Sequence, residues 1–324
     1  MRPPRFWAAD GPAWPGVVLA PLGGLVAAVT ARLVARGGWR ASVPVLCVGN
    51  ASVGGSGKTM VALDLAARLA ASGRAPHVLL RGYGGAVRGV RSVAAEDPAA
   101  LVGDEAKLLA AVAPTWVGAD RAASARAAVA AGAGVLVLDD GLQNPGLVKN
   151  LSLLVVDGGA GFGNGRVLPA GPLREPVVAA AARCAAMVLI GEDRQREAAR
   201  VAARVGLPVL RARLVVADAL SWRGVRVLAF AGIGRPEKVF ASLEEVGAVL
   251  VGREPFPDHH PYAAREIAAL RARAAALGAV LATTAKDAAR LGPAAEGVRV
   301  LRVALAWETP AAVEALLGGM FAGR

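Results

Sequence analysis

Short runs of apolar residues alternate with longer Ala-rich segments along the chain after Trp39. Such runs are typical of buried strands, whereas the Ala-rich stretches, such as Lys58 to Ala71, have apolar positions at helical spacing. The alternation predicts an α/β fold, with a mostly parallel sheet and helices on both of its faces. The strands expected in this first series are Val43 to Val48, His77 to Leu80, Val135 to Leu138, Leu153 to Val156 and Met187 to Ile190.

A second series of apolar segments begins near Val225 and predicts a second, smaller α/β domain. Its expected strands are Arg226 to Phe230, Ala248 to Val251, Ala279 to Thr283 and Val298 to Val303. With a boundary between about 205 and 220, we expect a distinct N-terminal segment over 1–40, a first domain over 41–215 and a smaller C-terminal domain over 216–324.

The first 40 residues differ from the rest. Trp7 and Trp14 precede a mainly apolar run from Val17 to Ala31, and Arg32 and Arg36 follow it. The run is shorter than the roughly 20 residues that span a bilayer, and tryptophan and arginine favour the headgroup region. We therefore expect an N-terminal membrane-anchoring helix that lies in the membrane interface, with a short membrane span and an ordinary core helix as the alternatives.

Composition narrows the choice of partners. Hydrophobic residues make up 55% of the 324 residues, which excludes a mainly disordered chain. Lys and Arg number 37 against 25 Asp and Glu, and the net charge of +12 favours anionic partners such as phosphates and acidic lipids. Aromatic residues are only 4%, too few for base-stacking platforms, so we expect no nucleic-acid partner. Nothing in the sequence indicates an obligate protein partner.

The strongest local signal is a glycine-rich loop between an apolar strand and an amphipathic helix. It ends in Gly54, Gly55, Ser56, Gly57, Lys58 and Thr59. Glycines let backbone N–H groups point at phosphate oxygens, and the helix N-terminus adds the positive end of its dipole. This pattern predicts a P-loop in which Lys58 binds the β- and γ-phosphates and the Thr59 hydroxyl coordinates Mg²⁺. One departure is Ser52, which stands where the strict pattern has glycine.

A P-loop requires a partner carboxylate on a neighbouring strand, and the run Val135 to Leu138 leads directly to Asp139 and Asp140. At the tip of a buried strand either carboxylate could hold Mg²⁺ or its waters, and the sequence does not distinguish between them. Partition-type ATPases are disfavoured because Val53 replaces their second lysine, and no Asn-Lys-x-Asp guanine-binding motif is present. No pattern indicates which residues contact the adenine ring.

Further fragments follow one another in a single order along nearly the whole chain. They are Arg81-Gly82-Tyr83, Gly103-Asp104-Glu105, Asp139-Asp140-Gly141-Leu142-Gln143, Gly161-Phe162-Gly163-Asn164-Gly165, Leu168-Pro169-Ala170-Gly171-Pro172-Leu173-Arg174-Glu175-Pro176, Phe230-Ala231-Gly232-Ile233-Gly234 and Phe256-Pro257-Asp258-His259-His260. Together with the P-loop and the N-terminal segment, this set resembles the tetraacyldisaccharide 4′-kinases of lipid A biosynthesis.

The resemblance implies an ATP- and Mg²⁺-dependent kinase that phosphorylates the 4′-hydroxyl of a tetraacyldisaccharide 1-phosphate, a lipid A precursor, at the cytoplasmic face of the bacterial inner membrane. It also implies that residues 41–215 are the kinase domain and that the C-terminal domain closes over the active site. The competing interpretation is a membrane-associated P-loop ATPase switch that has no small-molecule acceptor.

The resemblance further implies a catalytic dyad of Asp104 and His259, because a sugar hydroxyl needs a hydrogen-bonded base to attack phosphorus. From the residues alone, His259 could instead cap a helix beginning near Tyr262, and Asp104 could be an acid in the first turn of a helix. Residues expected to contact the substrate or support the site are Tyr83, Glu105, Arg121, Gln143, Asn164 and Arg174.

Three positions depart from the usual family pattern. Asn144 replaces a histidine, Met60 replaces a proline, and Ala285 replaces a glutamate. None of them belongs to the expected dyad or to the P-loop, although Asn144 removes one expected contact with the substrate.

Overall fold

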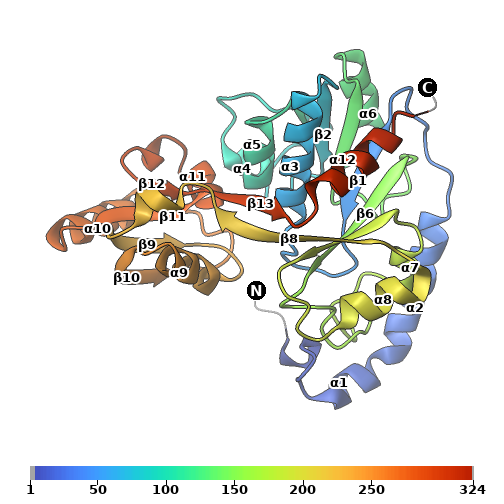
Figure 1. Ribbon diagram of the computed structural model, residues 1–324, viewed down its shortest axis with the longest axis horizontal. Coiled ribbons are helices and arrows are strands. Elements are labelled where there is room, and N and C mark those ends of the chain that lie inside the picture. Colours follow the sequence, from blue (N-terminus) through green and yellow to red (C-terminus); the bar gives the residue numbers. More distant parts are fainter. Residues whose placement is uncertain (1–3, 323–324) are drawn as a thin grey trace.

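Two sheets organise the protein (Figure 1). The computed structural model describes residues 4–322. The large lobe is built on a nine-stranded sheet in the order β13-β8-β7-β6-β1-β5-β2-β4-β3, and the small lobe on a four-stranded sheet in the order β10-β9-β11-β12. The expected α/β class, with a large mostly parallel sheet and a second smaller one, is confirmed.

The large sheet is parallel except at its two edges, where β3 pairs antiparallel with β4 and β13 pairs antiparallel with β8. Its strands are β1 (Val45–Gly49), β2 (Pro76–Leu80), β3 (Val90–Ser92), β4 (Thr115–Gly118), β5 (Val135–Asp139), β6 (Leu151–Asp157), β7 (Ala186–Ile190), β8 (Val209–Val216) and β13 (Val303–Trp307). In register, Val48 of β1 lies beside Asp139 of β5, so the loops after both strands emerge at the same edge.

Helices cover both faces of the large sheet (Figure 1). Alternate residues of β1 point to opposite faces, so Leu46 and Val48 pack in one core and Val45 and Cys47 in the other. The first core includes residues of α3 (Lys58–Ala71), α4 (Ala99–Val102), α5 (Asp104–Ala110) and α12 (Pro310–Gly319). The second includes residues of α6 (Arg121–Ala130), α7 (Val177–Ala181) and α8 (Glu197–Val205).

The small sheet is parallel throughout. It consists of β9 (Arg226–Ala231), β10 (Val249–Pro255), β11 (Val280–Thr284) and β12 (Arg299–Leu301). Phe240 and Leu243 of α9 (Pro236–Glu245) pack on one face, and helices α10 (Ala264–Ala276) and α11 (Ala285–Leu291) pack on the other. Two short 3₁₀ turns, η2 (Ala219–Trp222) and η3 (Gly292–Ala295), complete the lobe.

Strands β8 and β13, which precede and follow the small lobe in the sequence, run side by side in the large sheet (Figure 1). The structure differs from the expected division at the C-terminal end, because β13 and α12, which the division assigned to the second domain, lie on the large sheet. The reason is pairing across a long sequence separation: Val303 lies opposite Val216 and Trp307 opposite Ala212. The small lobe is thus an insertion between two strands of the large sheet.

The N-terminal segment forms a 3₁₀ turn, η1 (Arg5–Trp7), and two helices, α1 (Ala13–Val18) and α2 (Ala20–Val34). These helices lie against residues 158–176, which we call the β6–α7 loop. Gly16 faces the Ala170 carbonyl and Gly23 faces the Val167 carbonyl, both at a distance that leaves no room for a larger side chain. Within residues 4–322, no helix is both long and apolar enough to cross a membrane.

Candidate active site

The P-loop connects β1 to α3, as expected. Gly57 is the N-terminal cap of α3 and has a positive φ of 86°, a conformation that glycine adopts without strain. Ser52 forms a β-bridge with Leu173, and the Val53 N–H donates to the Pro172 carbonyl at 2.8 Å. Ser52 therefore fits at a position where the strict pattern has glycine, because here the P-loop pairs with the β6–α7 loop.

Asp139 is the last residue of β5, and Asp140 follows it beside the P-loop. Asp139 is 2% exposed and its Oδ1 has no hydrogen-bond partner among the described residues, while Asp140 lies 3.8 Å from the Lys58 ammonium. Burial and the charge of Glu105 raise the pKa of Asp139 to about 7, although Lys58 and Thr59 act in the opposite direction. Burial also raises the pKa of Asp140, but Lys58 and Arg174 outweigh it and hold that pKa below its usual value.

The β6–α7 loop supports Asp140. Arg174 donates to both carboxylate oxygens of Asp140, at 2.8 and 2.9 Å. The Gln143 amide bonds the Asn50 carbonyl and the buried carboxylate of Glu175, at 2.9 and 2.8 Å. Arg174 and Gln143 therefore bond residues at the base of the P-loop. Glu175 was not among the expected site residues.

The arrangement suits a magnesium ion bound together with phosphate. No group of three or more His, Cys, Asp or Glu side chains in residues 4–322 could hold a metal ion by itself. Mg²⁺ usually takes one or two protein ligands and completes its shell with waters and phosphate oxygens. The Asp139 Oδ1 and the buried Ser56 hydroxyl, neither of which has a hydrogen-bond partner within residues 4–322, both fit such a site.

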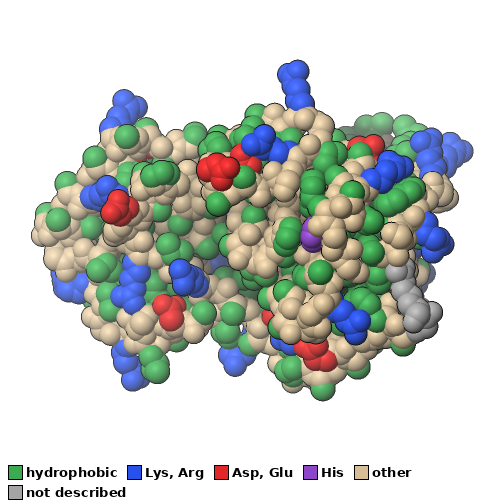
Figure 2. Space-filling model, turned by 90° about the horizontal axis from the view of Figure 1, so that it is seen from above, with side chains coloured by type: hydrophobic (Ala, Val, Ile, Leu, Met, Phe, Trp, Pro, Cys, Tyr) green, Lys and Arg blue, Asp and Glu red, His purple; other side chains and the backbone are tan. Residues whose placement is uncertain are grey.

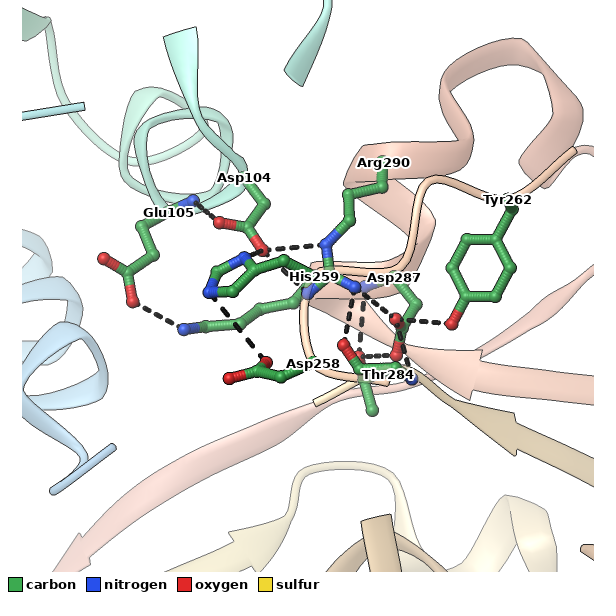
Figure 3. A network of polar contacts seen from close by, with 10 residues as sticks. Asp104, Glu105, Asp258, His259, Tyr262, Thr284, Asp287 and Arg290 are labelled. Atoms are coloured by element: carbon green, nitrogen blue, oxygen red, sulfur yellow. Dashed lines mark hydrogen bonds and ion pairs between the residues drawn. The ribbon is translucent and has the colours of Figure 1, made fainter. Parts of the chain in front are cut away.

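Asp104 and His259 meet across the two lobes (Figure 3). Asp104 begins α5 in the large lobe and is 4% exposed, and His259 lies in the loop after β10 of the small lobe. The His259 Nδ1 is 3.4 Å from the Asp104 Oδ2, and the other imidazole nitrogen is 3.9 Å from Asp258. His259 has a positive φ of 58°, which is uncommon for a residue with a side chain and indicates that its surroundings hold it in this position.

The charges around this pair determine its protonation. Burial raises the pKa of Asp104, but the hydrogen bond from His259 and the charges of Lys286 and Arg290 outweigh it and hold the pKa well below its usual range. The same contact with Asp104 raises the pKa of His259 above its ordinary value. Asp104 is therefore a carboxylate at neutral pH, and it stabilises the protonated form of the imidazole.

Two cations of α11 also reach the large lobe. Arg290 donates to Asp104 at 2.8 and 2.9 Å (Figure 3). Lys286 donates to Glu105 at 2.6 Å. Neither residue was among the expected site residues. A signal was available for Lys286, because it is one of five lysines in a chain whose other 32 basic residues are arginine (37 − 5 = 32).

A further interlobe contact lies at the P-loop itself. Arg235, before α9, bonds the Gly55 carbonyl at 3.2 Å and the Asp157 carboxylate at the end of β6, and Lys238 bonds the same carboxylate at 3.0 Å. Arg235 follows the Gly232-Ile233-Gly234 fragment, so its sequence position gave a weak signal.

The remaining expected site residues lie in different surroundings. The exposed Tyr83 ring is 5.7 Å from the His259 ring. Arg121 is buried, bonds the Gly118 carbonyl and has an Nε without a partner among the described residues. Asn164 lies apart from both groups, with its amide bonded to the Phe6 and Ala170 carbonyls beside the N-terminal helices.

Comparisons with known proteins agree with one another. The protein-family model for the tetraacyldisaccharide-1-P 4′-kinases matches residues 15–321. A tetraacyldisaccharide 4′-kinase of Gluconacetobacter diazotrophicus is 56% identical over 98% of this chain and 97% of its own length. One of Rhodospirillum centenum is 54% identical over 100% and 98%. The structure also matches a crystal structure of LpxK from Aquifex aeolicus in complex with ATP, with a TM-score of 0.74, 25% identity, and coverage of 94% of this chain and 99% of that one.

Proposed function

The chain belongs to the tetraacyldisaccharide 4′-kinase family, and we propose that its Asp104–His259 pair activates the hydroxyl that this kinase phosphorylates. The protein is an ATP-dependent lipid kinase that phosphorylates a lipid A precursor. The observation that carries the proposal is the 3.4 Å contact between Asp104 and His259, which come from different lobes, beside a P-loop.

In the proposed reaction, the Asp104 carboxylate favours the His259 tautomer that carries its proton on Nδ1, so the Nε2 lone pair is available. Nε2 takes the proton of the 4′-hydroxyl as that oxygen attacks the γ-phosphorus of ATP. The bond between the γ-phosphorus and the bridging oxygen breaks, and ADP leaves. Asp104 stabilises the imidazolium that forms, and Tyr83 lies where it can contact the sugar.

The P-loop and its surroundings bind the nucleotide in this proposal. The backbone N–H groups of Gly54 to Gly57, with Lys58, bind the phosphates. Thr59 and the Asp139–Asp140 pair hold Mg²⁺ or its waters, and the ion supplies neutralisation of the charge that develops on the phosphate oxygens. Arg174 binds the Asp140 carboxylate, and Gln143 supports the P-loop through the Asn50 carbonyl. The positive charge of Arg121 and the negative charge of Glu105 both act on Asp139.

The test measures transfer of radiolabelled γ-phosphate from Mg·ATP to a tetraacyldisaccharide 1-phosphate in detergent micelles. Asp104→Asn and His259→Gln should each lower kcat by about 10²- to 10⁴-fold with ATP affinity nearly unchanged, whereas Lys58→Ala should weaken ATP binding as well. Full transfer by both dyad variants would refute the dyad. ATP hydrolysis without transfer by the wild type would instead favour a nucleotide switch.

We also propose that α1 and α2 bind the cytoplasmic face of the inner membrane. Large apolar side chains on these helices are exposed at intervals of three or four residues, including Leu22 at 52%, Leu25 at 63% and Val29 at 47%. A stripe of this kind on the surface of a protein is typical of membrane or protein contacts. Arg32 and Arg36 stand at the end of α2, where they can meet anionic headgroups.

Flotation with vesicles that contain anionic phospholipid tests this surface. The double variant Leu22→Glu, Leu25→Glu should lose most vesicle binding, because two charges would have to enter the acyl region. The matched control is Leu220→Glu, since Leu220 is 85% exposed but lies in the small lobe. Equal loss of binding in both variants, or in neither, would contradict the proposed surface.

A further inference from the structure

Arg290 bonds Asp104 directly and is linked to His259 through one backbone carbonyl. Its Nε and Nη2 donate to the Asp104 Oδ2 at 2.9 and 2.8 Å, which is shorter than the 3.4 Å between that oxygen and His259. Its Nη1 donates to the Gly232 carbonyl at 2.7 Å, and the same carbonyl accepts the His259 backbone N–H at 3.1 Å. One guanidinium therefore connects the carboxylate of the large lobe to the backbone that carries the imidazole (Figure 3).

A buried carboxylate orients this guanidinium. Asp287 is fully buried, and its Oδ1 accepts from Arg290 at 2.8 Å, from the Tyr262 hydroxyl at 2.7 Å and from the Gly232 N–H at 3.1 Å. Its Oδ2 lies 2.6 Å from the Thr284 hydroxyl. A planar guanidinium with fixed donor directions can satisfy these acceptors together, which a lysine ammonium on a flexible stem does less well.

We propose that Arg290 is a positioning residue of the dyad: it aligns Asp104 with His259 across the two lobes and limits how strongly the carboxylate binds the imidazole. This inference rests on the proposed role of Asp104 and His259. Arg290 shares the Oδ2 acceptor with His259, so its removal leaves the imidazole as the remaining side-chain donor to that oxygen within residues 4–322.

Other charged and titratable groups also surround the pair, including Glu105, which follows Asp104 and accepts from Lys286. Asp258 lies near the His259 Nε2, the Tyr83 ring packs beside the imidazole, and the charge of Lys286 acts on Asp104. The positive charge of Arg290 lowers the pKa of both dyad members, and loss of that charge moves both pKa values upward. Since the base must be unprotonated to accept the hydroxyl proton, the acid limb of the kcat profile should then move to higher pH.

The experiment compares Arg290→Met and Arg290→Lys with the wild type in the micelle transfer assay between pH 5.5 and 9.5. Arg290→Met should lower kcat by about 30-fold or more and move the acid limb up by about 1 pH unit, with little change in the KM for Mg·ATP. Arg290→Lys should return the limb to its wild-type position and recover part of kcat. The control Arg271→Met removes an α10 arginine that bonds the Ala294 and Glu296 carbonyls within the small lobe, and it should leave the profile unchanged.

A second measurement needs no turnover. The chain has three histidines, so an NMR titration of ring-labelled protein reads the pKa of His259, which should be higher in Arg290→Met than in the wild type. An unshifted limb together with an unshifted His259 titration would overturn the inference, as would loss of kcat that follows only loss of thermal stability. Full transfer by Asp104→Asn would instead refute the dyad itself, whatever the Arg290 variants do.

Discussion

Asn164 uses its hydrogen-bonding groups on the backbone around it. Its amide donates to the Phe6 and Ala170 carbonyls at 2.8 and 2.9 Å, and its Oδ1 accepts the Arg166 N–H at 3.0 Å. These contacts favour support of the N-terminal turn over contact with the substrate. Asn164→Ala leaves three polar groups without this partner and should cost about 1–3 kcal/mol of stability, measured by denaturant unfolding. A raised KM for the lipid with unchanged stability would instead indicate a substrate contact.

Arg174 differs from Asn164 because it bonds a residue of the nucleotide site. Arg174→Met leaves the Asp140 carboxylate with only the Lys58 ammonium, at 3.8 Å, as an ion-pair partner within residues 4–322. Asp140 has a positive φ of 58°, so it depends on its surroundings to stay in place. We expect the KM for Mg·ATP to rise by about 10-fold, in line with roughly 1–2 kcal/mol for a charge-assisted pair. A wild-type dependence on Mg²⁺ and ATP would contradict this role.

At the scale of elements, apolar runs predicted the central strands of the large sheet but not β3 at one edge or β8 next to the other edge. β1, β5, β6 and β7 are buried on both faces and read as continuous apolar segments. β3 is exposed throughout, and the apolar residues of β8 are interrupted by Arg211 and Arg213, so neither has such a run. The P-loop follows a buried strand and Asp139 ends one, so both could be located from the apolar runs. Lys286 and Arg290 could not be located in this way, because they act on residues some 180 positions away.

The contact between the end of β6 and α9 joins the two lobes beside the P-loop. Asp157→Asn removes the carboxylate charge that holds Arg235 and Lys238 and so weakens both ion pairs. We expect faster hydrogen exchange at the start of α9 and around Gly55, measured by mass spectrometry, because local protection depends on such contacts. The control Glu244→Gln removes the charge of an exposed pair with Arg253 inside the small lobe. Equal exchange in Asp157→Asn and the wild type would show that these two ion pairs do not protect this contact between the lobes.

At the scale of the whole molecule, the acidic groups of the site lie between cations from several parts of the chain. On the face seen in Figure 2, Lys and Arg side chains are spread over both lobes rather than gathered in one patch. The net charge of +12 therefore does not by itself mark the binding surface. The order of elements along the sequence does not show that the small lobe is an insertion. The pairing of β8 with β13, the strands before and after that lobe, shows it.

The N-terminal helices and the nucleotide site share one structural support, the β6–α7 loop. On one side the loop packs against α1 and α2, and a Cβ added at Gly23 would lie 2.8 Å from the Val167 carbonyl oxygen. On the other side it pairs with Ser52 and carries Arg174, which holds Asp140. A displacement of α2 should therefore weaken the binding of ATP even in the absence of a membrane.

Substitutions at two adjacent glycines of α2 can distinguish the effect of the contact with the β6–α7 loop from the effect of membrane binding. Gly23→Val should push α2 away from the β6–α7 loop and raise the KM for Mg·ATP in detergent micelles, by about 3- to 10-fold for a displacement that costs roughly 1 kcal/mol. Gly24→Val is the matched control, because a Cβ there meets no atom within 4 Å, and it should leave the KM unchanged. Both variants place the same β-branched residue in the same helix, so lower helix propensity affects them equally. If the two KM values change together, the effect comes from the helix itself and the loop does not connect the two sites.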